Sequence, residues 1–236
     1  MDNHTEQLAD GVWRVEVAAY VNAFVVANDG HGEGEGLTVV DTGRRSAGPR
    51  LVRSIRLAGF DPRAVRDVLL THWHADHAGA AARFARSSAA PTVWIGEADH
   101  AVLTGAVEPR PVKPHATVTG RLAARLLRAP EPVHGARVLR PGECLPGAGG
   151  LEVVAAPGHT PGHCAFWLPQ AGVLLAGDAV FNVWFLSRGP RFLCSAMPEV
   201  PATLRRLAGL AYDTLAMAHG PPVTRRAPER VAALVS

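Results

Sequence analysis

The stretch T-H-W-H-A-D-H, which begins at Thr71, places three histidines and one aspartate within one short turn of chain. It directly follows a run of apolar residues, which predicts a strand that ends in H-x-H-x-D-H. Alternation along an extended backbone puts His72 and His74 on one side of the chain. Asp76 and His77 follow where the chain must bend, so this second pair can face another point in space. Two ligand pairs aimed at two points predict two metal ions.

Three further candidate ligands stand at the ends of other apolar runs, each beside a glycine: His159, Asp178 and His219. A neighbouring glycine lets the backbone turn tightly and approach a metal closely. Imidazole and carboxylate ligands suit zinc and also iron or manganese. Two such cations lower the pKa of a shared water towards neutrality and polarise a carbonyl or phosphoryl oxygen, so the predicted chemistry is hydrolysis.

Short apolar runs between turn residues predict the strands that would position these side chains. The predicted strands are Gly11–Val17, Val21–Ala27, Leu37–Val40, Val65–Leu70, Thr92–Ile95, Leu151–Ala155, Ala165–Leu168, Val173–Ala176 and Thr214–Ala218. Helical spacing predicts helices at Pro49–Ala58, His77–Ala85, Glu97–Leu103, Ala116–Leu127, Pro201–Leu210 and Pro228–Val235. Two blocks of strands, each interleaved with helices, predict an α/β fold with two sheets face to face and helices outside.

The domain organisation follows from length and from a change of character in the middle of the chain. A length of 236 residues with 47% hydrophobic residues supports a substantial core. We expect a single domain over residues 1–236, with a helical and proline-rich insertion at about 96–146. The insertion either shapes a substrate pocket or is a surface excursion without function.

Composition excludes several classes of function. The net charge is only +3, and the basic residues form no stripe with interleaved aromatics, so we expect no nucleic-acid partner. No apolar run is long enough for a membrane span, and the polar, acidic N-terminus does not resemble a signal peptide, which predicts a cytoplasmic protein. Cys144, Cys164 and Cys194 are odd in number and widely spaced, which predicts free thiols that are buried or half-buried.

Five motifs together resemble the metallo-β-lactamase-fold metallo-hydrolase superfamily. They occur in the family's order and cover the chain from Gly11 to about Pro222. The motifs are Asp41-Thr42-Gly43, Thr71 to His77, G-H-T-P-G-H from Gly158 to His163, Gly177-Asp178 and His219-Gly220. The resemblance implies a four-layer αββα sandwich of two mixed β-sheets.

The resemblance also implies a role for each candidate ligand. The first metal would be bound by His72, His74 and His159, the second by Asp76, His77 and His219, and Asp178 would bridge both. The implied cofactors are two zinc ions, with iron or manganese as alternatives, and the implied nucleophile is a bridging hydroxide. Asp76 could also carry a proton to the leaving group.

Two further residues have supporting roles under the same resemblance. Asp41 would support the metal-binding loop without binding metal, or be a plain turn residue. His163 would support its loop by hydrogen bonding rather than bind metal.

The branch of the superfamily is narrowed by two positions. A carboxylate at Asp178 argues against penicillin hydrolysis, because β-lactamases of this fold lack it, and favours the glyoxalase II or lactonase-like branch. Lactonases of the family place a tyrosine three residues further on, where this chain has Phe181, whose ring cannot donate a hydrogen bond. We therefore expect cleavage of an ester, thioester or lactone. The alternatives are phosphodiester hydrolysis, iron-dependent sulfur dioxygenase chemistry and a non-catalytic binding protein.

The segment from Phe181 to Phe192 is the candidate wall of the substrate pocket. Phe181, Trp184 and Phe185 directly follow the proposed bridging carboxylate. They predict an apolar surface beside the metals that suits an acyl or aromatic small molecule, although ordinary core packing explains the same residues. A small-molecule substrate and a monomer or homodimer complete the expectation.

Overall fold

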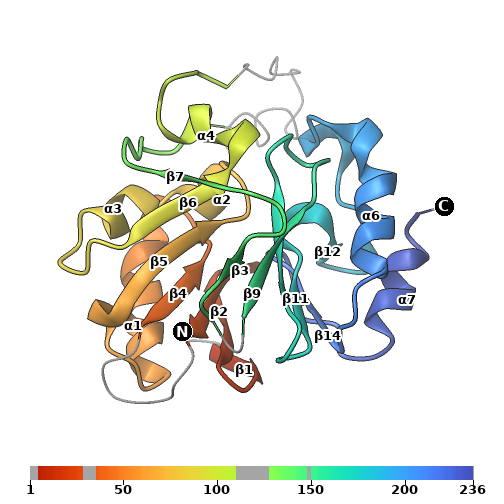
Figure 1. The fold of residues 1–236 in the computed structure, drawn as a ribbon, viewed down its shortest axis with the longest axis horizontal. Coiled ribbons are helices and arrows are strands. Elements are labelled where there is room, and N and C mark those ends of the chain that lie inside the picture. Colours follow the sequence, from red (N-terminus) through yellow and green to blue (C-terminus); the bar gives the residue numbers. More distant parts are fainter. Residues whose placement is uncertain (1–4, 29–35, 110–127, 148–149, 236) are drawn as a thin grey trace.

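A computed structural model of the chain describes residues 5–28, 36–109, 128–147 and 150–235 (Figure 1). The predicted helix Ala116–Leu127 lies outside these residues. The one-domain organisation and the insertion at about 96–146 stay predictions.

The first sheet contains seven strands in chain order. They are β1 (Thr5–Ala9), β2 (Val12–Ala18), β3 (Val21–Ala27), β4 (Leu37–Val40), β5 (Val65–Leu70), β6 (Thr92–Gly96) and β7 (Arg137–Leu139). Strands β1 to β4 pair antiparallel, whereas β4 to β7 pair parallel, so the sheet is mixed. The sheet places the end of β5, and thus the histidine-rich run, between two parallel neighbours.

The second sheet contains five strands in the order β14-β11-β10-β9-β8. They are β8 (Cys144–Leu145), β9 (Leu151–Ala155), β10 (Cys164–Leu168), β11 (Val173–Leu175) and β14 (Thr214–Ala216). Only β11 and β14 pair parallel, which brings the C-terminal ends of these two strands to the same edge. A separate two-stranded ribbon joins β12 (Phe181–Asn182) to β13 (Leu186–Ser187).

Helices cover the outer faces of both sheets, as Figure 1 shows. They are α1 (Gly48–Leu57), α2 (Ala75–Ala78), α3 (Ala81–Ala85), α4 (Glu97–Leu103), α6 (Val200–Ala208) and α7 (Ala227–Ala232). Short 3₁₀ turns lie at Arg45–Ala47, Pro62–Ala64, Gly177–Ala179, Arg191–Leu193 and Met197–Glu199.

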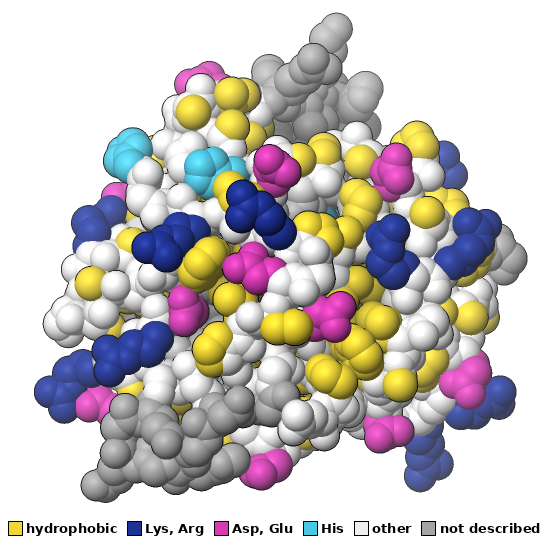
Figure 2. Space-filling model, in the orientation of Figure 1, with side chains coloured by type: hydrophobic (Ala, Val, Ile, Leu, Met, Phe, Trp, Pro, Cys, Tyr) yellow, Lys and Arg dark blue, Asp and Glu magenta, His cyan; other side chains and the backbone are white. Residues whose placement is uncertain are grey.

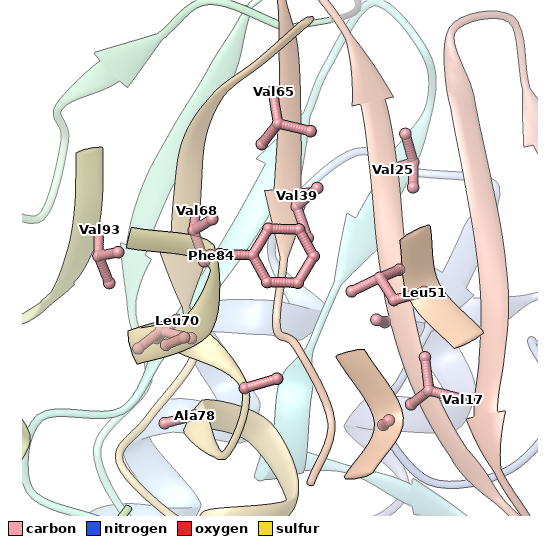
Figure 3. Packing of buried hydrophobic residues seen from close by; sticks show 14 of the residues in the cluster. Val17, Val25, Val39, Leu51, Val65, Val68, Leu70, Ala78, Phe84 and Val93 are labelled. Carbon is pink, nitrogen blue, oxygen red and sulfur yellow. The ribbon is translucent and has the colours of Figure 1, made fainter. Parts of the chain in front are cut away.

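Three apolar layers hold this arrangement together, and strand alternation explains them. Along β3, Val25 packs in the cluster with helices α1 and α3, whereas Phe24 and Val26 pack against the second sheet. A third cluster lies between the second sheet and helices α6 and α7. Figure 3 shows Leu51 and Phe84 beside the valines of the first sheet. The predicted four-layer αββα sandwich is confirmed.

The predicted helix His77–Ala85 is wrong in one respect, because it is broken into α2 and α3. Thr42 explains the break. Its backbone N–H and its hydroxyl both donate to the carbonyl of His77, each at 2.7 Å, and that carbonyl would otherwise continue the helix. The same hydroxyl accepts from the N–H of Ala80 at 3.2 Å. Strands β1, β7 and β8 and the β12–β13 ribbon were also absent from the sequence-based prediction.

On the face drawn in Figure 2, basic and acidic side chains alternate and do not gather by sign. The three cysteines are free thiols, as predicted, but Cys144 is exposed rather than buried or half-buried. Within the described residues, no helix has the length and hydrophobicity that crossing a bilayer requires.

Candidate metal centre

Four of the predicted site residues follow β5 and lie in the loop that leads into α2. His72, His74 and His77 are buried and Asp76 is almost completely buried. Helix α2 begins immediately after His74, so Asp76 and His77 are on its first turn. The strand end therefore presents His72 and His74, and the helical turn presents Asp76 and His77.

The other three residues come from the second sheet. His159 follows β9, Asp178 lies in the 3₁₀ turn Gly177–Ala179 after β11, and His219 follows β14. At Gly220 the backbone has φ +100°, and a side chain there would collide with the carbonyl oxygen of Asn182. The glycine beside His219 thus permits a close backbone approach at the edge of the site.

These seven residues converge on one place between the ends of the two sheets. Three groups have ligand atoms within 4.8 Å of one another and could each hold a metal ion: His72, His74 and His159; His72, His77 and Asp178; Asp76, His77 and His219. Asp178 lies at the centre. Its Oδ2 is 3.2 Å from His159 Nε2, and its Oδ1 is 3.4 Å from both His77 Nε2 and His219 Nε2.

The polar atoms of this cluster fit a cation better than one another. Within the described residues, His72 Nε2, His77 Nε2 and Asp178 Oδ1 are buried and have no hydrogen-bond partner. Leaving such groups unpaired in a protein interior is unfavourable, and bound cations would satisfy them. Nitrogen and carboxylate donors in groups of three match catalytic metal sites that keep a position open.

Protonation of the histidines is consistent with this fit. Burial lowers the pKa of His72 and His159 well below the ordinary value and that of His74 to about 3, so these imidazoles are neutral at pH 7. A histidine must be neutral to bind a metal ion. Burial also lowers the pKa of His77, but the Asp178 carboxylate and other acids outweigh it and raise this pKa. A cation at His77 would therefore displace a proton.

A cavity of about 500 Å³, here named the aromatic cavity, opens beside the cluster. Five site residues line it: His74, Asp76, His159, Asp178 and His219. The three predicted pocket residues line it as well: Phe181, Trp184 and Phe185. Trp184 is 89% exposed and Phe185 is 70% exposed, so these two rings lie outside the core. Phe181 is only 8% exposed and stacks on the His219 ring, with 5.0 Å between centroids and 2° between planes.

Comparison with known proteins decides the family. The model of the metallo-beta-lactamase superfamily matches residues 18–219, which include all seven converging residues. The chain belongs to the metallo-beta-lactamase superfamily. Members of this superfamily bind metal ions, typically zinc, and the chain is therefore a metallo-hydrolase of that superfamily.

Three relatives illustrate the range of the superfamily around this chain. Hydroxyacylglutathione hydrolase of Aeromonas hydrophila is 34% identical over 162 residues, which are 68% of this chain and 49% of that protein. N-acyl homoserine lactonase AttM of Agrobacterium fabrum is 29% identical over 224 residues, which are 88% of this chain and 79% of that protein. The crystal structure of a metallo-beta-lactamase family protein from Thermus thermophilus is 27% identical, with a TM-score of 0.71, over 97% of this chain and 79% of that one.

Asp41, the acid of the first superfamily motif, lies directly behind the centre. Its carboxylate accepts hydrogen bonds from the N–H of Thr71 at 2.9 Å and from the Thr71 hydroxyl at 2.8 Å. Its Oδ2 is also 2.9 Å from His77 Nδ1. Because an ionised carboxylate only accepts, Nδ1 is the donor, and the lone pair of Nε2 is then the one that a cation can use.

His163, the last residue of the G-H-T-P-G-H motif, supports the centre from the other side. Its Nε2 accepts a hydrogen bond from the backbone N–H of Asp178 at 3.0 Å. Neither His163 nor Asp41 belongs to the three groups that could hold a metal. Both side chains hold members of the cluster in place, since Asp41 contacts His77 and His163 contacts Asp178.

Three supporting residues were missed by the sequence analysis. Asp99 on α4 is buried and accepts from the Thr160 hydroxyl at 2.6 Å and from the N–H of Gly162 at 2.9 Å, which fixes the loop after His159. Burial raises the pKa of Asp99 to about 6.

The other two hold the loop that carries His219. The Asn22 amide donates to the carbonyl of Gly220 at 2.7 Å, and the carbonyl of Tyr20 lies 3.1 Å from His219 Nδ1. No local pattern marks these residues, because their partners are about two hundred positions away in the chain. The one weak signal in the sequence is that Asn22 is a polar residue in the otherwise apolar strand β3.

Proposed function

We propose that this protein is a dinuclear zinc hydrolase that cleaves an ester, thioester or lactone bond in a small molecule. The observation that carries the proposal is the position of Asp178. Its two carboxylate oxygens face different groups of histidines, with His159 on one side and His77 and His219 on the other. A carboxylate in that position can join two metal ions.

Each residue of the cluster has a proposed role. The first ion would be held by His72, His74 and His159, the second by Asp76, His77 and His219, with Asp178 shared. Such a pair of cations would activate a water molecule at neutral pH and polarise the substrate carbonyl. The protein's own contribution is to fix the donors in place through Asp41, His163 and Asp99.

Asp76 has a second proposed role in proton transfer. Its carboxylate lies 3.7 Å from His219 and 3.8 Å from His77, and it lines the aromatic cavity. A leaving group in that cavity is therefore within reach of an acid that can carry a proton to it.

The surroundings of the cluster favour an acyl substrate. The cavity wall is mostly apolar by surface area, with Phe181, Trp184 and Phe185 beside the polar cluster. Two relatives carry names of acyl hydrolases, hydroxyacylglutathione hydrolase and N-acyl homoserine lactonase. These names support acyl chemistry for this chain as well.

Metal content and turnover test the proposal together. We expect about two zinc ions per chain by mass spectrometry and turnover within a panel of phenyl esters, thioesters and lactones. Asp178→Asn keeps the shape of the side chain but removes its charge, and we expect loss of at least one ion and of most turnover. Asp61→Ala removes an exposed carboxylate and is the matched control.

The same panel separates the rival functions. Preferential turnover of bis-p-nitrophenyl phosphate over every acyl substrate would replace the proposal with phosphodiester hydrolysis. A single iron per chain with oxidation of a persulfide would replace it with dioxygenase chemistry. Full acyl turnover by metal-free protein would refute the metal-dependent mechanism.

A further inference from the structure

A second cavity lies beside the first and has almost the same size. It has a volume of about 490 Å³ and is here named the α4 cavity, because Ala98 and Val102 of α4 line it. Trp73, Val107, Phe192 and two prolines are further apolar residues of its lining. Either cavity alone is large enough for a small-molecule ligand.

The two cavities meet at the candidate metal centre. His74 lines both of them, and so does Leu193. The segment after Leu193 is tied to the centre, because the N–H of Ser195 donates to the carbonyl of His159 at 2.9 Å. The Ser195 hydroxyl donates to the same carbonyl at 3.2 Å. A molecule whose reacting carbonyl lies at His74 can therefore extend in two directions.

We propose that the α4 cavity is a second substrate subsite, which takes an uncharged, apolar acyl chain while the leaving group occupies the aromatic cavity. This inference rests on the proposed acyl hydrolysis. It adds a substrate class, namely acyl compounds with a medium-length chain.

The lining of the α4 cavity supports an uncharged apolar occupant. Its only fully buried acid, Asp99, already accepts two hydrogen bonds from the loop after His159. Glu108 is the other acid of the lining, it is exposed, and it would repel an anionic chain. The indole of Trp73 and the valines of α4 and its following turn offer contact to methylene groups.

The position of Asp76 decides which half of the substrate enters which cavity. In hydrolysis the oxygen of water bonds to the acyl carbon, the bond from that carbon to oxygen or sulfur breaks, and a proton passes to the departing group. Asp76 lines the aromatic cavity but is not among the lining residues of the α4 cavity. The leaving group therefore belongs in the aromatic cavity, and the acyl chain extends past His74 towards α4.

A substitution that fills the α4 cavity tests the subsite. Ala98 is exposed and lines the cavity, so Ala98→Phe places a ring in it without disturbing the core. Glu97 is exposed on the same turn of α4 but does not line the cavity, so Glu97→Phe is the matched control. The zinc-loaded proteins are assayed with phenyl acetate, butyrate and hexanoate, which share one leaving group.

In the wild type we expect the ratio of kcat/KM for hexanoate over acetate to exceed about tenfold, because four more methylenes are buried. Ala98→Phe should lower this ratio about tenfold, and Glu97→Phe should leave it unchanged. No chain-length preference in the wild type, or equal ratios in the two variants, would overturn the subsite.

Binding of hexanoate, followed by amide chemical shifts, separates failure of the subsite from failure of the proposed function. Saturable shifts at Ala98 and Val102 in the wild type, with a hexanoate affinity that is about tenfold weaker in Ala98→Phe, support the subsite even if no ester is turned over. Shifts confined to Trp184 and Phe185, or no saturable shifts, overturn it whatever the outcome of the turnover assay.

Discussion

Asp41→Asn exchanges one carboxylate oxygen for an NH2 group in the buried network that joins Asp41 to Thr71 and His77. The substitution keeps the size of the side chain. It also keeps the backbone, because Asp41 has φ +59° and asparagine tolerates the left-handed region as well as aspartate does. Any effect therefore comes from the lost charge and the lost acceptor.

The magnitude follows from the three donors that meet Asp41. The remaining carbonyl oxygen can still accept from the N–H of Thr71, and the Thr71 hydroxyl can rotate. His77 Nδ1 then loses its acceptor, and an unpaired buried donor of this kind costs about 1–3 kcal/mol. If His77 changes tautomer to escape this cost, Nε2 becomes protonated, and metal affinity should fall about 10- to 100-fold.

Competition for zinc against a chromophoric chelator measures this change directly. Asp67→Asn is the matched control, since Asp67 is an aspartate of the strand before the site that accepts a hydrogen bond from Trp94 Nε1 at 2.7 Å. Its amide oxygen can still accept that bond, so zinc affinity should not change. Equal zinc affinity in Asp41→Asn and wild type, with both proteins folded by circular dichroism, would refute the reasoning about the His77 tautomer.

Three further predictions concern stability. The pKa of the Asp99 carboxyl is about 6 in the folded protein and 3.8 ordinarily, so the folded protein holds this proton more tightly than the unfolded chain does. Relative to Asp99→Asn, the wild type should therefore lose about 2–3 kcal/mol of unfolding free energy as the pH rises from 4 to 7. Urea titrations of the wild type and Asp99→Asn that differ equally at both pH values would contradict this. Gly220→Ala should destabilise the protein by roughly 2–4 kcal/mol, because the new methyl group collides with the carbonyl oxygen of Asn182. Gly59 also has a positive φ but has open space around it, so Gly59→Ala should show only the backbone strain. Similar urea midpoints for the two variants would count against the collision. Removal of metal with EDTA should lower the melting temperature by roughly 5–15 °C, and a melting temperature unaffected by EDTA and by added zinc would speak against a resident metal.

The fold was predictable because its strands are short apolar runs with clear ends. Strands β3 and β5 lie where the sequence placed them, and the helical spacing of α1 and α6 gave their positions within two residues. Prediction failed where a distant residue competes for a backbone group. The hydroxyl of Thr42 occupies the carbonyl of His77 and divides one expected helix into two, and helical periodicity cannot reveal such a contact.

The candidate site was predictable except where a residue's role depends on contacts with distant parts of the chain. Histidines and acids at strand ends are visible in a sequence, so the seven converging residues could be named. Asp99 could not, because an acid on a short helix is ordinarily a solvated residue and only its burial against Thr160 gives it a supporting role. The carbonyl of Tyr20 carries no side-chain signal at all. The exposure of Trp184 depends on a loop whose path the sequence does not define.

The seven converging residues are divided between the two sheets, and this division bears on how the protein is made. Under the proposed ligand assignment, neither half of the chain holds a complete set of metal ligands. The first set needs His159 in addition to His72 and His74, and the second needs His219 in addition to Asp76 and His77. A ribosome adds residues in order, so the second set cannot close until His219 has left the exit tunnel. Under that assignment both metal sites are completed only late in synthesis, after most of the chain has been made.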